Sequence, residues 1–358
     1  MIHLRNILLF LFLLATPVAA PAASSSGSGG FNATKVIFDH LKDSYEWHIT
    51  TIGDKHITID LPVILYSDRV GWQLFSSGVF HHSPEYNGFH IATGGAYEGK
   101  ITEYDEQGNE QRPVLDISIT KNVLAVFVNA LLLVIIVLCV SRWYKKHTLD
   151  DGAPKGFVGA MEAVVCMIID DVIKPNIGDQ SARFTPYLLT VFFYILLSNL
   201  MGLVPIFPGG ANVTGNIAVT LALALCTFVA VNVFGNREYW KEILWPDVPM
   251  WLKVPMPLMP FIEIFGLFVK PFALTVRLFA NIFAGHTALL VFVCLIFITV
   301  GVNKYLGGAM SVISVFFSVF MNILELLVAF IQAFVFTMLS AVFIGLAQPS
   351  HHHKEEEK

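Results

Sequence analysis

Apolar residues in this chain gather in long runs, and only the first third of the sequence departs clearly from that pattern. Three runs, over residues 123–140, 187–204 and 217–234, each hold 18 residues. A helix of about 20 apolar residues crosses the hydrocarbon core of a bilayer. Each run therefore predicts one membrane-spanning helix.

Two later apolar runs are much longer, at residues 257–300 and 306–347. At about 1.5 Å per residue, a helix over either run exceeds roughly 60 Å, whereas a bilayer core is about 30 Å thick. Each run is therefore either two spans or one long helix that is tilted or bent. The lack of a polar turn within either run favours the single long helix, with Pro271 as a candidate kink.

The charges between the runs predict the orientation. Basic residues follow the first run at Arg142, Lys145 and Lys146, which is typical of a cytoplasmic flank. Residues 157–172 carry several acids and predict an interfacial amphipathic helix. The pattern predicts about five crossings plus this helix in a cell inner (plasma) membrane, with the N-terminal domain outside and a cytoplasmic tail at 351–358.

The N-terminal region has three parts by composition. Residues 1–22 hold a short apolar core and then small residues, which predicts a cleaved signal peptide, with a retained first transmembrane helix as the alternative. Residues 23–30 are rich in serine and glycine and predict a flexible linker. Residues 31–120 show apolar–polar alternation and turn signals, which predict a small, mainly β extracytoplasmic domain ahead of a transmembrane domain at 121–350.

Composition narrows the class further. The chain is 55% hydrophobic and 14% charged, against about 25% charged in soluble proteins, which indicates an all-α polytopic membrane protein beside the β domain. The net charge of −5, with no long basic tract, argues against nucleic-acid binding. The four cysteines form no CxxC pair, and the histidines of residues 31–120 lie at no ligand spacing, so we predict no metal site. Residues 94–100 fit the start of a phosphate-binding loop, but Ile101 replaces the required hydroxyl, so no nucleotide or other cofactor is expected.

Charged residues inside the first of the two long runs mark the candidate site. Glu263, Lys270 and Arg277 are spaced seven residues apart and share one stripe of a helix. An arginine in hydrocarbon costs between about 2.5 and 17 kcal/mol, so a paired role or a wet cavity is the default interpretation. Arginine keeps its proton at ordinary pH, and so Arg277 is a fixed charge rather than a relay. The nearest groups able to carry protons are His286 and Glu325.

The surrounding sequence resembles the subunit a family of the rotary F-type ATP synthases, in a bacterial form with an extra N-terminal domain. The residues that carry the resemblance are Arg277-Leu278-Phe279-Ala280-Asn281, Ala284-Gly285-His286, Lys270-Pro271, Gln332-Ala333-Phe334, Asn199-Leu200-Met201-Gly202-Leu203-Val204-Pro205 and Asn212-Val213-Thr214. It covers roughly residues 121–347 and leaves the N-terminal domain outside.

The resemblance implies a proton-translocating stator subunit, which has no catalytic site and works with a ring of c subunits, the b subunits, the rest of the complex and membrane lipid. Arg277 would face the c subunits and separate two aqueous half-channels. His286 and Glu325 would line the outer half-channel, in exchanged order relative to many family members. Glu263 and Lys270 would pair with each other or line the inner half-channel.

Helical angles add two further residues. Asn281 follows Arg277 by four positions on the same face, whereas His286 lies about 180° round the helix. Gln332 shares a face with Glu325 and can offer an acceptor to a guanidinium. We expect Asn281 and Gln332 to orient water or Arg277, while Asn199 and Asn212 are more typical of helix packing or capping.

Two other classes of function stay open from the residues alone. A self-contained ion-coupled secondary transporter predicts internal repeats and paired broken helices, and the two halves of the chain show no repeat. A membrane scaffold predicts that the buried charges only hold helices together. The choice between protons and sodium is not encoded in a recognisable pattern of this chain.

Overall fold

The computed structural model describes residues 42–52, 55–105, 107–147, 152–204, 208–244, 258–302 and 304–348. Two compact units divide the chain. One contains the residues up to Val128, with Met201–Val213 and Thr287–Asn322, and the other contains Asn129–Leu200, Thr214–His286 and the residues from Ile323 on. The predicted signal peptide (1–22), linker (23–30) and tail (351–358) lie outside the described residues.

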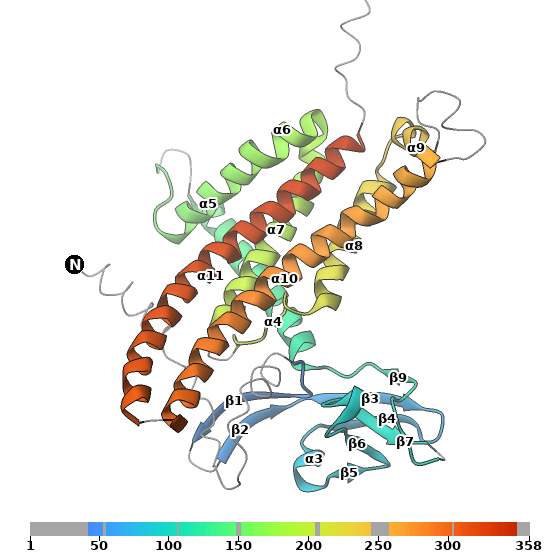
Figure 1. Cartoon of the computed structure of the whole chain (residues 1–358). Coiled ribbons are helices and arrows are strands. Elements are labelled where there is room, and N and C mark those ends of the chain that lie inside the picture. Colours follow the sequence, from blue (N-terminus) through green and yellow to red (C-terminus); the bar gives the residue numbers. More distant parts are fainter. Residues whose placement is uncertain are drawn as a thin grey trace, which may run out of the picture. The chain divides into compact units, whose positions relative to one another are not determined.

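The polar N-terminal region is built from short antiparallel strands (Figure 1). The strands pair as β1-β2, as β4-β3-β9 and as β5-β6-β7-β8. The strands and short helices are β1 (Glu46–Ile52), β2 (Lys55–Asp60), β3 (Pro62–Ser67), β4 (Gly71–Ser76), α3 (Val79–His82), β5 (Glu85–Tyr86), β6 (Phe89–Ile91), η1 (Gly95–Tyr97), β7 (Ile101–Tyr104), β8 (Glu110–Gln111) and β9 (Leu115–Asp116). The prediction of a small, mainly β region is confirmed.

The core of this β region follows from strand alternation. Along β3, every second side chain is buried, with Val63 and Leu65 fully inside. They pack with Tyr45, Phe89 and Ile101 in one apolar cluster. The hydroxyl of Tyr45 lies at the edge of this cluster and donates a hydrogen bond to the carboxylate of Asp116 at 2.7 Å, so the buried phenol has a hydrogen-bond partner.

The remaining elements are helical. Their bounds are α4 (Lys121–Lys146), α5 (Phe157–Met167), η3 (Ile168–Ile173), α6 (Lys174–Ile177), η4 (Gly178–Gln180), α7 (Ser181–Leu203), α8 (Ile217–Val233), α9 (Arg237–Leu244), α10 (Leu258–Val302) and α11 (Lys304–Leu346). Figure 1 shows α10 and α11 as long continuous ribbons, in orange and red. The prediction of one long helix for each long apolar run is therefore confirmed, and Pro271 lies inside α10.

By length and composition, four helical stretches of the described chain could cross a membrane: Lys121–Lys146, Phe157–Leu203, Phe261–Gly301 and Gly307–Leu346. The apolar helix α8 is shorter, and with it the number matches the five predicted crossings. The predicted interfacial segment, residues 157–172, is helical and continues through the short helical segments η3, α6 and η4 into α7. Gly178 has a φ of 69° between the two parts, a conformation that glycine adopts most readily.

The second of the two units, which contains Asn129–Leu200, Thr214–His286 and the residues from Ile323 on, is the helical unit. In its core, the long helices pack against each other. On α10, Leu274, Leu278 and Ile282 are buried at a spacing of four residues, which makes one apolar face. They belong to the same cluster as Ala333 and Phe336 of α11. This face fixes which side of α10 is turned away from the protein core, and therefore where its polar residues lie.

Candidate functional site

Arg277 lies on the side of α10 that is turned away from the packed leucines. Its side chain is exposed, and it makes no ion pair or hydrogen bond with any other residue that the structure describes. The exposed neighbours on this side include Ala273, Ala280, Asn281 and Ala284, most of which are small. A permanent cation on an apolar helix is therefore presented on a surface that another protein can approach closely.

His286 and Glu325 come together, although the sequence separates them widely. The Nδ1 atom of His286 lies 3.0 Å from Oε1 of Glu325, and the Glu325 side chain is only 5% exposed. The contact is close but poorly aligned, so both carboxylate oxygens lack a hydrogen bond within the described part of the chain. A buried carboxylate without hydrogen-bond donors is costly unless water or a proton reaches it.

Gly285 makes the approach of these two groups possible. A Cβ atom at this position would lie 3.1 Å from Oε1 and 3.3 Å from Cδ of Glu325, which is tighter than ordinary van der Waals contact. A glycine inside a helix usually costs about 0.5–1 kcal/mol relative to alanine. The space that it leaves for Glu325 is the local reason for accepting that cost here.

Gln332 is buried on the same face of α11 as Glu325, as their spacing of seven residues along the helix predicts. Within the described residues, neither Gln332 nor Asn281 forms a hydrogen bond with Arg277. The expected orientation of Arg277 by these amides therefore stays a prediction.

Asn199 behaves as the sequence suggested, as a packing residue. Its Nδ2 donates to the carbonyl of Ala329 at 3.1 Å, and its Oδ1 accepts from the hydroxyl of Thr214 at 2.7 Å. Both polar ends of a buried amide are satisfied, so Asn199 joins three segments of the helical unit.

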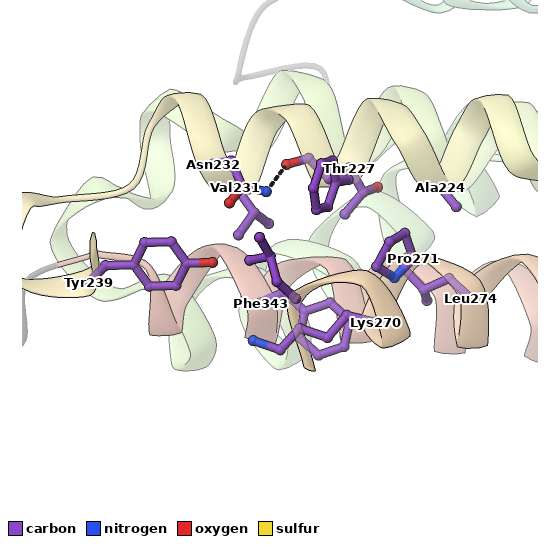
Figure 2. A pocket seen from close by; sticks show the side chains of 11 residues that line it. Ala224, Thr227, Val231, Asn232, Tyr239, Lys270, Pro271, Leu274 and Phe343 are labelled. Carbon is purple, nitrogen blue, oxygen red and sulfur yellow. Dashed lines mark hydrogen bonds between the residues drawn. The ribbon is translucent and has the colours of Figure 1, made fainter. Parts of the chain in front are cut away.

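Glu263 and Lys270 do not form the pair that their spacing allowed. Lys270 instead places its Nζ over the ring of Phe343, 5.4 Å from the ring centroid. Lys270 also lines a narrow cavity between α8, α9, α10 and α11 (Figure 2). Tyr239 and Asn232 line this cavity too, and sequence reasoning missed both of them. The signal that could have found Asn232 is its place as an asparagine near the end of an apolar helix.

The β region contains one group of candidate metal ligands among the described residues: Glu46, Asp60 and His81. Nε2 of His81 lies 3.0 Å from Glu46 and 3.4 Å from Asp60, which are opposite each other on β1 and β2. Linear spacing could not predict this cluster, because it depends on strand pairing. Nε2 of His81 lies close to both facing carboxylates, whose like charges across the two strands repel each other.

The segment at residues 94–100 lacks the architecture of a phosphate-binding loop. It is followed by strand β7 rather than by a helix whose N-terminus could receive phosphate.

Comparison with known proteins gives two matched regions. The family model described as ATP synthase A chain matches residues 123–345. A second model, described as Domain of unknown function (DUF8433), matches residues 36–119.

Several proteins named ATP synthase subunit a are similar to this chain. The one from Pelodictyon phaeoclathratiforme is 47% identical over 248 residues, which are 68% of this chain and 69% of the relative. The one from Chlorobium phaeobacteroides is 45% identical over 247 residues, 68% of each protein. The one from Myxococcus xanthus is 39% identical over 284 residues, which are 77% of this chain and 88% of the relative. With the matched model spanning more than half of its length, this chain belongs to the ATP synthase A chain family.

Proposed function

We propose that this protein is the proton-translocating stator subunit a of an F-type ATP synthase. Arg277 carries the proposal, because it is a permanent cation, exposed on a long apolar helix, with no partner among the described residues. A charge so placed in a membrane needs an opposite charge from another subunit. Ionised carboxylates on a passing ring of c subunits would supply it.

The fixed charge of Arg277 would then do two things. It would attract each ionised c-subunit carboxylate as the ring turns, and it would repel protons from the direct route between the two sides of the membrane. Protons would have to load onto the ring on one side and leave on the other. The small side chains around Arg277 would let the ring approach closely enough for this contact.

His286 and Glu325 would form the proton-carrying step of the outer half-channel. The carboxylate of Glu325 has two oxygens that no described residue satisfies, so a water chain or a shared proton would complete it. The Nδ1 atom of His286, 3.0 Å away, provides the second station of such a relay. Which group receives the proton first would be set by the side from which water enters.

The inner half-channel would lie at the other end of α10, near Glu263 and Lys270. Asn281, one helical turn beyond Arg277, and Gln332, on the face of Glu325, would hold water close to the arginine.

The ATP chemistry would belong to other subunits, because the role proposed for this chain requires only ion passage. The b subunits would hold it stationary against the ring.

The same proposal places the chain in the inner (plasma) membrane. The basic residues after the first span, Arg142, Lys145 and Lys146, would be cytoplasmic, and the β region and the outer half-channel would face the opposite side. The C-terminus would then be cytoplasmic. The alternative, a self-contained ion-coupled transporter, would not need Arg277 to meet another subunit.

Replacing Arg277 with alanine tests the proposal. In membrane vesicles that contain the assembled complex, ATP-driven acidification and passive proton leak are followed separately. We expect pumping to be abolished and leak through the membrane sector to rise. Arg183→Ala is the matched control, because Arg183 is an exposed arginine of the same unit that stacks on Phe234 instead. Normal pumping in Arg277→Ala would overturn the stator role and favour the transporter.

A further inference from the structure

A narrow cavity lies between α8, α9, α10 and α11 within the helical unit (Figure 2). Its wall is mostly apolar, with Ala224, Val231, Leu267 and Leu274 among the lining residues. The space available to the centre of a water molecule is about 10 Å³, which is close to the minimum for one water. An acyl chain or a drug-sized molecule needs several hundred Å³, so the size favours water.

Two polar atoms at this cavity have no protein partner in the described part of the chain. They are the hydroxyl oxygen of Tyr239 and Oδ1 of Asn232, and both are fully shielded from the surface. Each unsatisfied buried group costs about 1–3 kcal/mol, which a bound water would recover. A water that reached both atoms would have two of the polar partners that an internal water requires.

The backbone holds both groups in place. The Nδ2 atom of Asn232 donates to the carbonyl of Phe228 at 2.7 Å, which fixes the amide plane and leaves Oδ1 unbonded. The ring of Tyr239 packs against Gly235, where a Cβ atom would lie 2.8 Å from Cδ1 of the tyrosine. Only glycine admits the ring at that distance. Both side chains are thus oriented by their surroundings rather than free to turn toward another partner.

Lys270 brings a charge to the same cavity. Lys270 lines the cavity, and its Nζ lies over the ring of Phe343, 5.4 Å from the ring centroid (Figure 2). Burial raises the pKa of Tyr239 above its ordinary value, so the phenol stays neutral and can both donate and accept a hydrogen bond. A neutral hydroxyl that accepts a hydrogen bond from one water and donates to another can take part in proton transfer along the water chain.

We propose that Tyr239 and Asn232 hold a water molecule that connects α9 with Lys270, as part of the inner half-channel. The inference rests on the proposed function, and it adds two positioning residues that neither the sequence nor the family match assigns. The carrier is water, and the species that moves is the proton. No other ligand is implied by the size of the cavity.

Access of water is tested directly by silver ions, which are small and enter aqueous paths. The four native cysteines, Cys139, Cys166, Cys226 and Cys294, are first replaced by serine. Asn232→Cys is then exposed to Ag⁺ from the cytoplasmic side of the membrane. We expect rapid inhibition of pumping. Thr337→Cys is the control, because Thr337 is fully buried in the same unit and does not line the cavity, and it is expected to be insensitive.

The contribution to proton flow is tested with Tyr239→Phe, which removes the hydroxyl and keeps the ring on Gly235. We expect ATP-driven pumping to fall about fivefold, the equivalent of one lost hydrogen bond. Tyr194→Phe is the matched control, because Tyr194 is a partly buried tyrosine of the same unit that does not line the cavity, and its pumping should stay close to the wild type. If Tyr239→Phe fails to assemble, Asn232→Leu tests the same water from its other side.

Wild-type pumping in an assembled Tyr239→Phe complex, or an Asn232→Cys that silver does not inhibit, would overturn the role of this water molecule. Either result would leave the stator role intact, because that role is judged by Arg277→Ala in a chain with both residues present. Conversely, normal pumping in Arg277→Ala would remove the stator role whatever silver does at residue 232.

Discussion

Two carboxylates in this protein, one partly buried and one buried, have opposite surroundings. Asp116 of the β region accepts from the hydroxyl of Tyr45 at 2.7 Å, from Arg112 at 2.9 Å and from the backbone N–H of Ser118 at 3.1 Å. Glu325 of α11 is more deeply buried, yet no described residue donates a hydrogen bond to either of its oxygens. His286 approaches it closely without good alignment.

The difference separates a structural carboxylate from one suited to carrying protons. Donors that surround Asp116 stabilise its charge and tie β9 to the start of the β region, so the group contributes to folding. An unsatisfied carboxylate such as Glu325 contributes little to stability, but it can accept a proton or water without first breaking protein hydrogen bonds. Buried polar groups that lack hydrogen-bond partners within the protein are therefore the ones to test for a role in proton transport.

The largest effect that this comparison predicts is from Glu325→Gln, which keeps the shape and removes the titratable oxygen. We expect proton flux to fall on the order of 100-fold, the range for loss of a positioned acid or base. Assembly should be little changed, because no described hydrogen bond is lost. Flux is measured as ATP-driven acidification of vesicles, with complex content checked by immunoblotting.

The control for that experiment is Glu162→Gln, which changes an exposed acid of α5 in the same unit. It should pump like the wild type. If Glu325→Gln also pumps normally, or if it lowers complex content and flux in equal proportion, Glu325 is a structural residue like Asp116.

The helices were predicted well from the sequence, for a simple reason. Runs of apolar residues and a lone arginine within one of them are local features, and they need no knowledge of neighbouring helices. Arg277 and His286 were expected on different sides of α10 from the helical angle alone. The exposed guanidinium and the inward imidazole confirm that expectation.

Contacts between helices could not be predicted in the same way. The meeting of His286 with Glu325 depends on the register between α10 and α11, which is set by packing at Gly285 and along the buried leucine face. The orphaned oxygens of Tyr239 and Asn232 depend on how four helices enclose one small space. In the β region, the Tyr45–Asp116 contact joins residues 71 positions apart, and no local pattern encodes it.

A smaller effect is expected from Gly285→Leu, which sharpens the comparison by disturbing Glu325 without changing it. The new side chain would start about 3.1 Å from Oε1 and would push the carboxylate away from His286. Overpacking of this kind typically costs about 1–3 kcal/mol, and we expect roughly a tenfold loss of flux.

Gly266→Leu is the matched control on the same helix, because a Cβ atom there would meet nothing within 4 Å. It should retain most of the flux. Equal losses in the two variants would show that α10 tolerates no larger residue at either position, and that the space beside Glu325 has no special role.

The smallest effect is expected at Asp116, because its carboxylate already accepts several hydrogen bonds. Tyr45→Phe removes one of the donors to Asp116 and leaves Arg112 and Ser118 in place, so we expect a loss of about 1 kcal/mol in local stability. Hydrogen exchange of the β3 amides, measured by mass spectrometry on the whole protein, should speed up about fivefold. Tyr104→Phe is the control, because its exposed hydroxyl makes no hydrogen bond with the described residues.

The pH dependence of this contact follows from the direction of the pKa shift. Burial and the neighbouring Asp116 raise the pKa of Tyr45 above its ordinary value of about 10. A raised pKa means that the folded state favours the protonated phenol, so its contribution is complete below pH 10 and declines as the pH rises beyond it. The difference in exchange between wild type and Tyr45→Phe should therefore shrink above about pH 10. A constant difference across that range would mean that the hydroxyl does not stabilise the β region through Asp116.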